Sequence, residues 1–190
     1  MRSAAKDGKE SSWDKARAAS LEAIKGAEID ILAIPLVNKL NSKKDYFTTS
    51  SCSGRINILE LDGFGAKFTA DFLATWHGPC TSEGIKAALS KASRQVWLKV
   101  EPPIIHVSCR DLDAADALLK TAYSAGFKYS SIKSLKNGVL VEINSSEKME
   151  LPLFDEKLLV TDDYIAYLAD IANKKMERSY AKLMKLTKAL

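Results

Sequence analysis

The chain has 190 residues, of which 46% are hydrophobic and 27% charged, a composition typical of an ordinary soluble domain with a core of its own. No apolar run approaches the length of a membrane span, and the N-terminus lacks the apolar stretch of a secretory signal, so we expect no membrane attachment. Three cysteines, an odd number, indicate reduced thiols and a cytoplasmic location.

The positive charge is concentrated at the C-terminus. Residues 169–190 contain six Lys or Arg and two acids, an excess of four that equals the formal net charge of +4. A basic end of this kind attracts phosphate backbones, and it is equally typical of a solvated helix face.

The chain begins with a helical region, for which we take residues 1–41. Apolar spacing predicts a helix over residues 12–25, and a second apolar segment spans residues 29–40. Pro35 interrupts this second segment and favours the start of a new helical turn there.

The most informative segment is Thr48-Thr49-Ser50-Ser51-Cys52-Ser53-Gly54-Arg55. Six consecutive hydroxyls or thiols end in a glycine, which tolerates unusual backbone angles, and in a guanidinium suited to carboxylates and phosphates. The segment is suited to an anionic or polyhydroxylated ligand. A turn that leads into a strand is the alternative interpretation.

Strands and helices follow in mixed order. We expect a strand over 55–61, a hairpin at Asp62–Gly65, and a strand over 67–76 in which Phe68, Ala70, Phe72, Ala74 and Trp76 share one face. Helices are predicted over 81–92, 111–125 and 162–188, capped by Thr81 or Ser82, by Asp111 and by Thr161, with Gly126 ending the second. Further strands are predicted over residues 96–100, 104–109, 128–135, 139–143 and 148–153, with Asn137-Gly138 as a hairpin turn.

A weak internal repeat indicates how these elements assemble. The order strand, His-x-x-Cys, helix, strand occurs first around His77 and Cys80, and again around His106 and Cys109. With several hairpins, this predicts an α/β (α+β) fold with one strongly curved, barrel-like and mostly antiparallel sheet made from two similar halves. We expect a single domain over 1–190, with the sheet core in 42–160 and a long basic helix in 161–190.

The histidines and cysteines allow two interpretations. Two His-x-x-Cys pairs could hold zinc, but neither contains Cys-x-x-Cys, and Cys109 alternates in phase with buried residues, so we expect no metal. His106 lies on the opposite sheet face from Ile105, either as an interior histidine or as a site residue. His77 ends its strand beside Trp76, whose indole can stack on an aromatic ring.

A second polar cluster contains Glu101 and Arg110, which form either a ligand site or a surface pair. Arg110 stands at the start of a helix, where the helix dipole disfavours a cation, and this points to a ligand or an ion pair. The sequence contains no dinucleotide-binding glycine fingerprint, phosphate-binding loop or serine nucleophile elbow.

Several segments resemble a known family. The run Tyr46–Ile56 resembles the signature of the wybutosine-synthesizing methyltransferases, the third enzyme of that tRNA pathway. The resemblance covers nearly the whole chain from about Trp13. Agreement continues in Trp76-His77, Glu101-Pro102, Ile105–Leu112, Gly126-Phe127-Lys128, Ser131-Ile132, Leu158–Ile165 and Ala172–Glu177.

The resemblance implies a reaction. This family transfers a methyl group from S-adenosylmethionine to N-4 of 7-aminocarboxypropyl-demethylwyosine, the tricyclic base next to the anticodon of phenylalanine tRNA. It also implies a barrel-like sheet from two similar halves. We expect no metal requirement, and we favour a monomer.

Roles follow for individual residues. His106 or His77 is the expected general base. The residues expected to bind cofactor or substrate are Thr49, Ser50, Ser51, Ser53, Gly54, Arg55, Trp76, Glu101 and Arg110. In the final helix, Lys174, Arg178, Lys182 and Lys185 form a basic ridge that we expect to hold the tRNA, beside an apolar stripe of Ile165, Leu168, Ala172, Met176, Ser179 and Leu183. A tRNA-binding module without catalysis and a zinc-dependent hydrolase are the alternatives.

Overall fold

The computed structural model describes residues 12–63, 70–136 and 138–190. Within these ranges the helices are α1 (Ser12–Ala23), α2 (Ile34–Asn41), α3 (Ser82–Leu89), α4 (Leu112–Ala125) and α5 (Asp162–Ala189), with a 3-10 turn at Ile24–Gly26. The strands are β1 (Tyr46–Cys52), β2 (Arg55–Leu61), β3 (Asp71–Trp76), β4 (Gln95–Glu101), β5 (Ile104–Cys109), β6 (Ser131–Ser134), β7 (Val139–Ile143), β8 (Met149–Asp155) and β9 (Lys157–Leu158).

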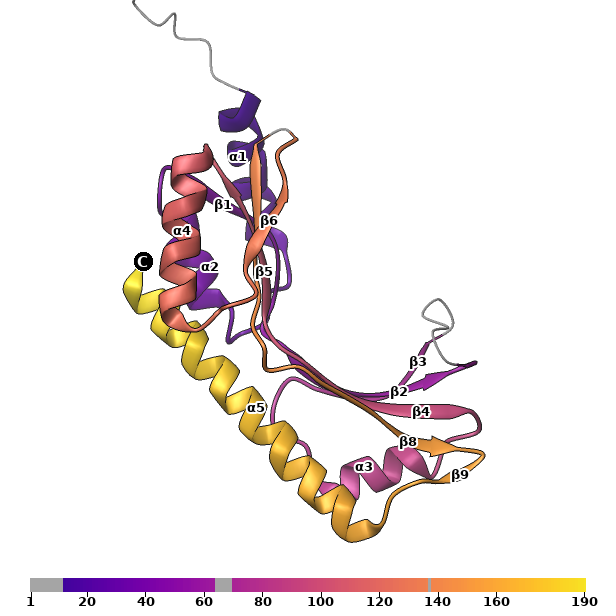
Figure 1. Ribbon diagram of the computed structural model, residues 1–190. Helices are drawn as coiled ribbons and strands as arrows, with labels where there is room; N and C mark the ends of the chain where they lie inside the picture. The colour runs from indigo at the N-terminus through magenta and orange to yellow at the C-terminus, as the bar shows by residue number, and fades with distance from the viewer. Residues whose placement is uncertain (1–11, 64–69, 137) are drawn as a thin grey trace, which may run out of the picture.

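The strands form two antiparallel sheets rather than one. The upper sheet in Figure 1 has the order β1-β5-β7-β6, and the lower sheet has the order β3-β2-β4-β8-β9. The expectation of a single barrel-like sheet is therefore wrong, because no closed barrel forms among the described strands. Strand pairing stops at Gly54 and at Pro102-Pro103, where the chain passes from one sheet to the other. At the two prolines it stops because proline has no N–H to donate to a strand ladder.

The predicted repeat corresponds to two similar units. In the lower sheet β3 and β4 flank β2 and are antiparallel to it, so they run parallel to each other and are connected through α3. In the upper sheet β5 and β6 flank β7 in the same way and are connected through α4. Each half is thus a split β-α-β unit with a third strand inserted between the parallel pair.

The helices α2, α3, α4 and α5 cover one side of the two sheets, which we call the helix face, and we call the opposite side the open face (Figure 1). The helix α1 lies along the free edge of β1, where Arg17 and Ser20 donate to the backbone oxygens of Tyr46 and Thr48. The core of the upper sheet contains Ile105 and Val107, packed beneath α2, α4 and the end of α5. The core of the lower sheet contains Ile56 and Leu98, packed beneath α3 and the first half of α5. The predicted apolar stripe of α5 is confirmed, since all six residues are buried. None of the described helices has the length and apolarity needed to cross a bilayer.

Helix ends agree with the sequence. The side chains of Thr81, Asp111 and Thr161 accept hydrogen bonds from the first turns of α3, α4 and α5. Gly126 ends α4 with φ of 105°, a left-handed angle that favours glycine. The strand expected over 128–135 is shorter, and the two residues of β9 were not predicted. The two predicted hairpin turns fall partly outside the described residues.

One predicted alternation is wrong at Phe72. In the pairing of β2 with β3, Ile58 lies opposite Ala74, but the next residue, Leu59, lies opposite Phe72. Leu73 is therefore an extra, unpaired residue, which makes a β-bulge in β3. The bulge moves Phe72 to the opposite face from Ala74 and Trp76, and Phe72 is 56% exposed. Phe68 of the same predicted strand lies outside the described residues.

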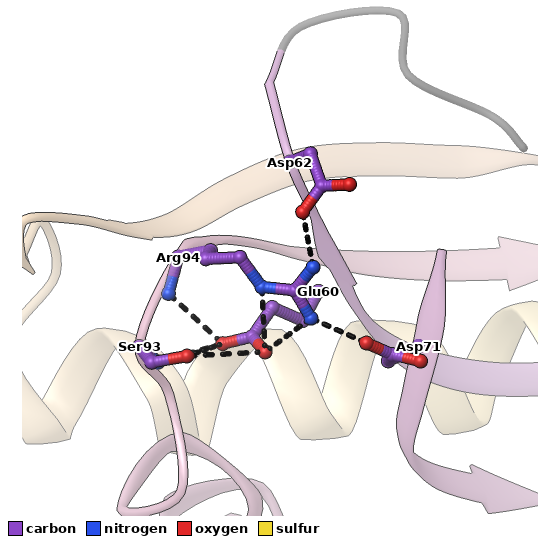
Figure 2. Close-up of polar contacts among 5 residues, drawn as sticks. All are labelled: Glu60, Asp62, Asp71, Ser93 and Arg94. Atoms are coloured by element: carbon purple, nitrogen blue, oxygen red, sulfur yellow. Dashed lines mark hydrogen bonds and ion pairs between the residues drawn. The ribbon is translucent and has the colours of Figure 1, made fainter. Parts of the chain in front are cut away.

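A buried carboxylate fixes the far end of the lower sheet. Glu60 in β2 accepts hydrogen bonds from the backbone N–H groups of Ser93 and Arg94, at 2.6 and 3.0 Å, and from the Arg94 guanidinium (Figure 2). Arg94 also pairs with Asp62 and Asp71. Burial acts to raise the pKa of Glu60, but these hydrogen bonds outweigh it and hold that pKa below its ordinary value.

Candidate functional site at the junction of the two sheets

The polar residues singled out in the sequence gather where the chain passes between the sheets. Three segments cross there: Ser53-Gly54 between β1 and β2, Pro102-Pro103 between β4 and β5, and residues 144–148 between β7 and β8. Three clefts adjoin this junction, with volumes of about 770, 310 and 390 Å³. We call them the first, second and third clefts.

The hydroxyl run forms most of β1, so the interpretation as a turn that leads into a strand is wrong for this segment. A bulge at Thr49 shifts the register between the pairs Thr48–Val107 and Ser50–His106. Thr48 is buried and its backbone N–H donates to Asn41 Oδ1 at 2.8 Å, which ties β1 to α2. Thr49, Ser50 and Ser51 line the second cleft.

Gly54 permits the close approach of two crossings. Its φ is 89°, and a Cβ at this position would lie 2.7 Å from the backbone oxygen of Glu101. Any other residue would strain the backbone and push the β1–β2 crossing away from Pro102 and Pro103. Gly54 therefore allows the β1–β2 and β4–β5 crossings to pack against each other.

Arg55 and Glu101 form an ion pair that stands between two clefts. Nε of Arg55 donates to Oε2 of Glu101 at 2.8 Å, and Nδ2 of the fully buried Asn57 donates to the same oxygen at 2.8 Å. Thr75 in turn donates to Oδ1 of Asn57. The hydrogen bond that Arg55 donates to the Glu101 carboxylate raises the pKa of Arg55, so the guanidinium stays charged. Arg55 lines the first cleft and Glu101 lines the third.

His106 lies in a chain of polar groups on the open face. Its Nδ1 is 2.7 Å from Oγ of Ser50, and its Nε2 is 3.1 Å from Oε2 of Glu142. Burial acts to raise the pKa of Glu142, but hydrogen bonds from Lys133, Asn144 and His106 outweigh it and lower that pKa. An ionised carboxylate only accepts hydrogen bonds, so Nε2 of a neutral His106 carries the proton and Nδ1 is the basic atom.

His77 lies at the rim of the first cleft with Asp30. Nδ1 of His77 is 3.7 Å from Oδ1 of Asp30, and half of the His77 side chain is exposed. Oδ2 of Asp30 accepts a hydrogen bond from the backbone N–H of Ser53 at 2.7 Å. Ser53 is buried and its hydroxyl also reaches Asp30, so Ser53 positions this carboxylate. The backbone oxygen of His77 accepts from the Tyr180 hydroxyl of α5.

Two predicted ligand-binding residues lie away from this group. Trp76 packs on the helix face against the lower core, where a Cβ on Gly84 of α3 would lie 3.2 Å from the indole. The Arg110 guanidinium pairs with Asp14 and Asp45 and covers the ring of Trp13 at 4.4 Å. Arg110 therefore joins α1 to the far end of the upper sheet, and we leave it out of the site.

The predicted basic ridge of α5 also has protein partners. The side chain of Glu147, in the third crossing, is 6% exposed and lies 2.8 Å from Nζ of Lys182, 3.2 Å from Arg178 and 3.8 Å from Lys175. Burial acts to raise the pKa of Glu147, and these cations outweigh it and lower that pKa. Lys174 pairs with Asp170 one turn away and is mostly exposed.

The thiols have different surroundings. Cys109 is fully buried, as predicted, and burial raises its pKa to about 12. Cys52 lines the first cleft. Its pKa is raised mainly by burial and also by the negative charge of the nearby Asp30, so it stays a neutral thiol. Over the described ranges, no three His, Cys, Asp or Glu side chains gather closely enough to hold a metal ion.

Asp30, Asn57 and Glu142 belong to the site but were not predicted from the sequence. Glu142 is one acid in an alternating strand, Val-Leu-Val-Glu-Ile, and such a residue is usually solvated. Asn57 offered a signal, because a polar residue in the apolar strand 55–61 has to find a partner when it is buried.

The sequence matches the family model described as Methyltransferase TYW3 over residues 7–190. A Pyrococcus furiosus protein named tRNA(Phe) 7-((3-amino-3-carboxypropyl)-4-demethylwyosine(37)-N(4))-methyltransferase 1 is 42% identical over 171 residues, 88% of this chain and 87% of that protein. An Archaeoglobus fulgidus protein with the corresponding name is 42% identical over 172 residues, 90% of this chain and 87% of its own length. The structure of the PH1069 protein from Pyrococcus horikoshii superposes with a TM-score of 0.89 at 38% identity, covering 93% of this chain and 95% of that chain.

Proposed function

The chain belongs to the TYW3 methyltransferase family, and from that premise we propose that it methylates N-4 of the 7-(3-amino-3-carboxypropyl)-4-demethylwyosine base of phenylalanine tRNA, with S-adenosylmethionine as the methyl donor. The observation that carries the proposal is the junction itself. It places a charged guanidinium, a carboxylate-bound histidine and a run of hydroxyls beside three clefts.

The chemistry of the first cleft fits the methyl donor. S-adenosylmethionine has a carboxylate, an ammonium, ribose hydroxyls and an adenine ring, so its site needs donors, acceptors and apolar surface. Arg55 can bind the carboxylate, because among the described residues only its Nε has a hydrogen-bond partner. Asp30 can accept from the ammonium, and Ile29, Ile31 and Leu32 offer apolar surface. The volume of about 770 Å³ lies in the range usual for such ligands.

Bound in this way, S-adenosylmethionine supplies an electrophilic methyl group. The protein has to hold the acceptor nitrogen in line with the methyl and remove its proton. Ser50 is the exposed end of the polar chain, so its hydroxyl receives that proton and passes its own to Nδ1 of His106. Glu142 stabilises the protonated imidazole that results. His77 is the alternative base, at the rim of the first cleft.

The tRNA is expected to be held partly by α5. Lys174, Arg178 and Lys185 are exposed and follow one another along the helix, which suits a row of phosphates. Lys182 is different, because only 17% of its side chain is exposed and its ammonium is 2.8 Å from the buried Glu147, whereas Arg178, 3.2 Å from the same carboxylate, is 71% exposed. We therefore propose Lys174, Arg178 and Lys185 as the tRNA contacts of the ridge, with Lys182 as the residue that fixes the helix.

A methyl-transfer assay tests the proposed function. Phenylalanine tRNA carrying the demethylated base is incubated with the protein and S-adenosylmethionine, then digested to nucleosides for mass spectrometry. We expect the modified nucleoside to gain one methyl group, assigned to N-4 by fragmentation. A protein that binds the tRNA without transferring a methyl would support the binding-module alternative instead.

A further inference from the structure

We propose that the third cleft, lined by Glu101, Tyr129, Lys133, Glu142 and Lys148 among others, binds the 3-amino-3-carboxypropyl group of the substrate base. This inference rests on the proposed function and assigns one of the clefts to one part of the substrate. The sequence alone did not say which polar cluster holds the cofactor and which holds the base.

The charges of the third cleft match the group to be bound. A 3-amino-3-carboxypropyl group carries an ammonium and a carboxylate on one carbon, so its site needs both an acceptor and a cation within a few ångströms. Two carboxylates and two ammonium groups line this cleft of about 390 Å³, and the exposed ring of Tyr129 lies with them. The first cleft offers cationic charge from Arg55, and none of the described residues that line it is a lysine.

Glu101 can receive the ammonium. Both hydrogen bonds that it accepts from the described part of the chain, from Arg55 and Asn57, end on Oε2. Oε1 therefore retains its capacity to accept from a ligand. Asn57 is fully buried and is held in turn by Thr75, so the carboxylate is fixed before the substrate arrives.

Two lysines can receive the carboxylate. Lys133 is 3.0 Å from Glu142 and Lys148 is 3.2 Å from Glu150, with 45% and 64% of the lysine side chains exposed. Because both lysine side chains reach solvent, either ammonium can turn from its protein partner to a ligand carboxylate that restores the ion pair. Both lysines are therefore available to bind an anionic ligand group at the mouth of the cleft.

The third cleft is directly connected to the candidate base. Oε1 of Glu142 binds Lys133, and Oε2 of the same carboxylate binds Nε2 of His106. A side chain anchored at Lys133 would therefore hold its tricyclic ring close to His106 and Ser50. Binding of the group would position the acceptor nitrogen, in addition to raising affinity.

The test uses two tRNAs, one with the complete base and one whose tricyclic base lacks the aminocarboxypropyl group. Binding of each is measured for the parent, for Lys133→Met/Lys148→Met, and for the control Lys120→Met/Lys157→Met. The control removes the same charge from two exposed lysines outside the cleft. Thermal melting checks that all three proteins are folded.

We expect the parent to prefer the complete base by about tenfold or more, the scale of one well-placed ion pair. The cleft variant should lose most of this preference, whereas the control should keep it. If the parent methylates the complete base but the cleft variant keeps the preference, or the control loses it equally, the cleft assignment is overturned and the proposed function stands. If the parent transfers no methyl to the complete base, the proposed function fails and this inference fails with it.

Discussion

Nε of Arg55 donates a hydrogen bond to Oε2 of Glu101 over 2.8 Å, at the point where both strands leave the lower sheet. The two side chains are each about two-fifths exposed, and each lines a different cleft. A half-exposed pair of this kind contributes little to folding. Because the pair lies between the two clefts, we propose that it serves the ligands on either side.

The first prediction follows from that position. Arg55→Ala should lower methyl transfer at least tenfold, about 1.4 kcal/mol of transition-state binding, because the carboxylate of S-adenosylmethionine loses its guanidinium partner. The melting temperature should stay near that of the parent. Lys86→Ala is the matched control, since it also removes a cation from a half-exposed pair, with Asp162 on the surface of the lower half. Normal turnover by Arg55→Ala would remove Arg55 from the mechanism.

The second prediction concerns the proton acceptor. His106→Asn should lower the rate of transfer about a hundredfold while changing the dissociation constant of S-adenosylmethionine little, because a base acts in the transition state. Single-turnover rates and calorimetry separate the two effects. A rate within a few-fold of the parent would mean that His106 is structural, and His77→Asn would then be the variant to measure.

The third prediction concerns Glu142 as a positioning residue. Its carboxylate accepts from Nε2 of His106, which leaves Nδ1 without a proton and able to accept from Ser50. The side-chain amide in Glu142→Gln can instead donate to Nε2 and so place the proton on Nδ1. We therefore expect the rate of transfer to fall about tenfold or more while the dissociation constant of S-adenosylmethionine changes little. A rate equal to that of the parent would mean that Glu142 does not position the base.

The fourth prediction concerns stability and uses Glu60, which lies far from the clefts (Figure 2). Its folded-state pKa is lowered below the ordinary value of 4.5, so its ionised form stabilises the fold above that pH. Glu60→Gln should lower the free energy of unfolding by about 2 kcal/mol at pH 7, because buried donors lose a charged acceptor. The difference should shrink as the pH falls below 4.5, where the parent carboxyl gains its proton. Urea titrations at several pH values measure it, and a difference independent of pH would refute this explanation.

The fifth prediction concerns the basic ridge of α5. Lys174→Gln/Arg178→Gln/Lys185→Gln should weaken tRNA binding and reduce its salt dependence by at most about three phosphate equivalents. Filter binding across a salt series measures the slope. Lys182 is omitted because its side chain is only 17% exposed and makes the shortest contact to the buried Glu147, so its loss would destabilise the fold. The Arg178 side chain is 71% exposed, and Lys175 and Lys182 remain beside Glu147 when Arg178 is changed. If the salt dependence of tRNA binding is unchanged, the ridge is a solvated helix face that does not contact the tRNA.

The sequence predicted local structure better than the arrangement of the sheets. Periodicity and caps gave β2, β5 and β7 with their observed bounds and the start of α5, because these signals lie within a few neighbouring residues. The division into two sheets was missed, since Gly54 and Pro102-Pro103 read as ordinary strand ends. Their effect depends on which strands pair across the junction, and that is a long-range property.

The candidate site was predicted in part for the same reason. The hydroxyl run, Arg55 and His106 carry chemistry that is visible in their residue types. The contact between Ser50 and His106 joins residues 56 positions apart and exists only because β1 pairs with β5. Glu142 reaches the site through the pairing of β5 with β7, and nothing near it in the sequence marks it. Arg110 shows the converse, because its unfavourable place at a helix start is explained by structural ion pairs.

The most direct test is a crystal structure of the protein with S-adenosylhomocysteine, the product of the donor. We expect the ligand in the first cleft, with its carboxylate on the Arg55 guanidinium and its ammonium near Asp30. Its sulfur should point towards Ser50 and His106. A structure in which the ligand lies in the third cleft or against the cations of α5 would contradict the assignment of the donor and acceptor sites.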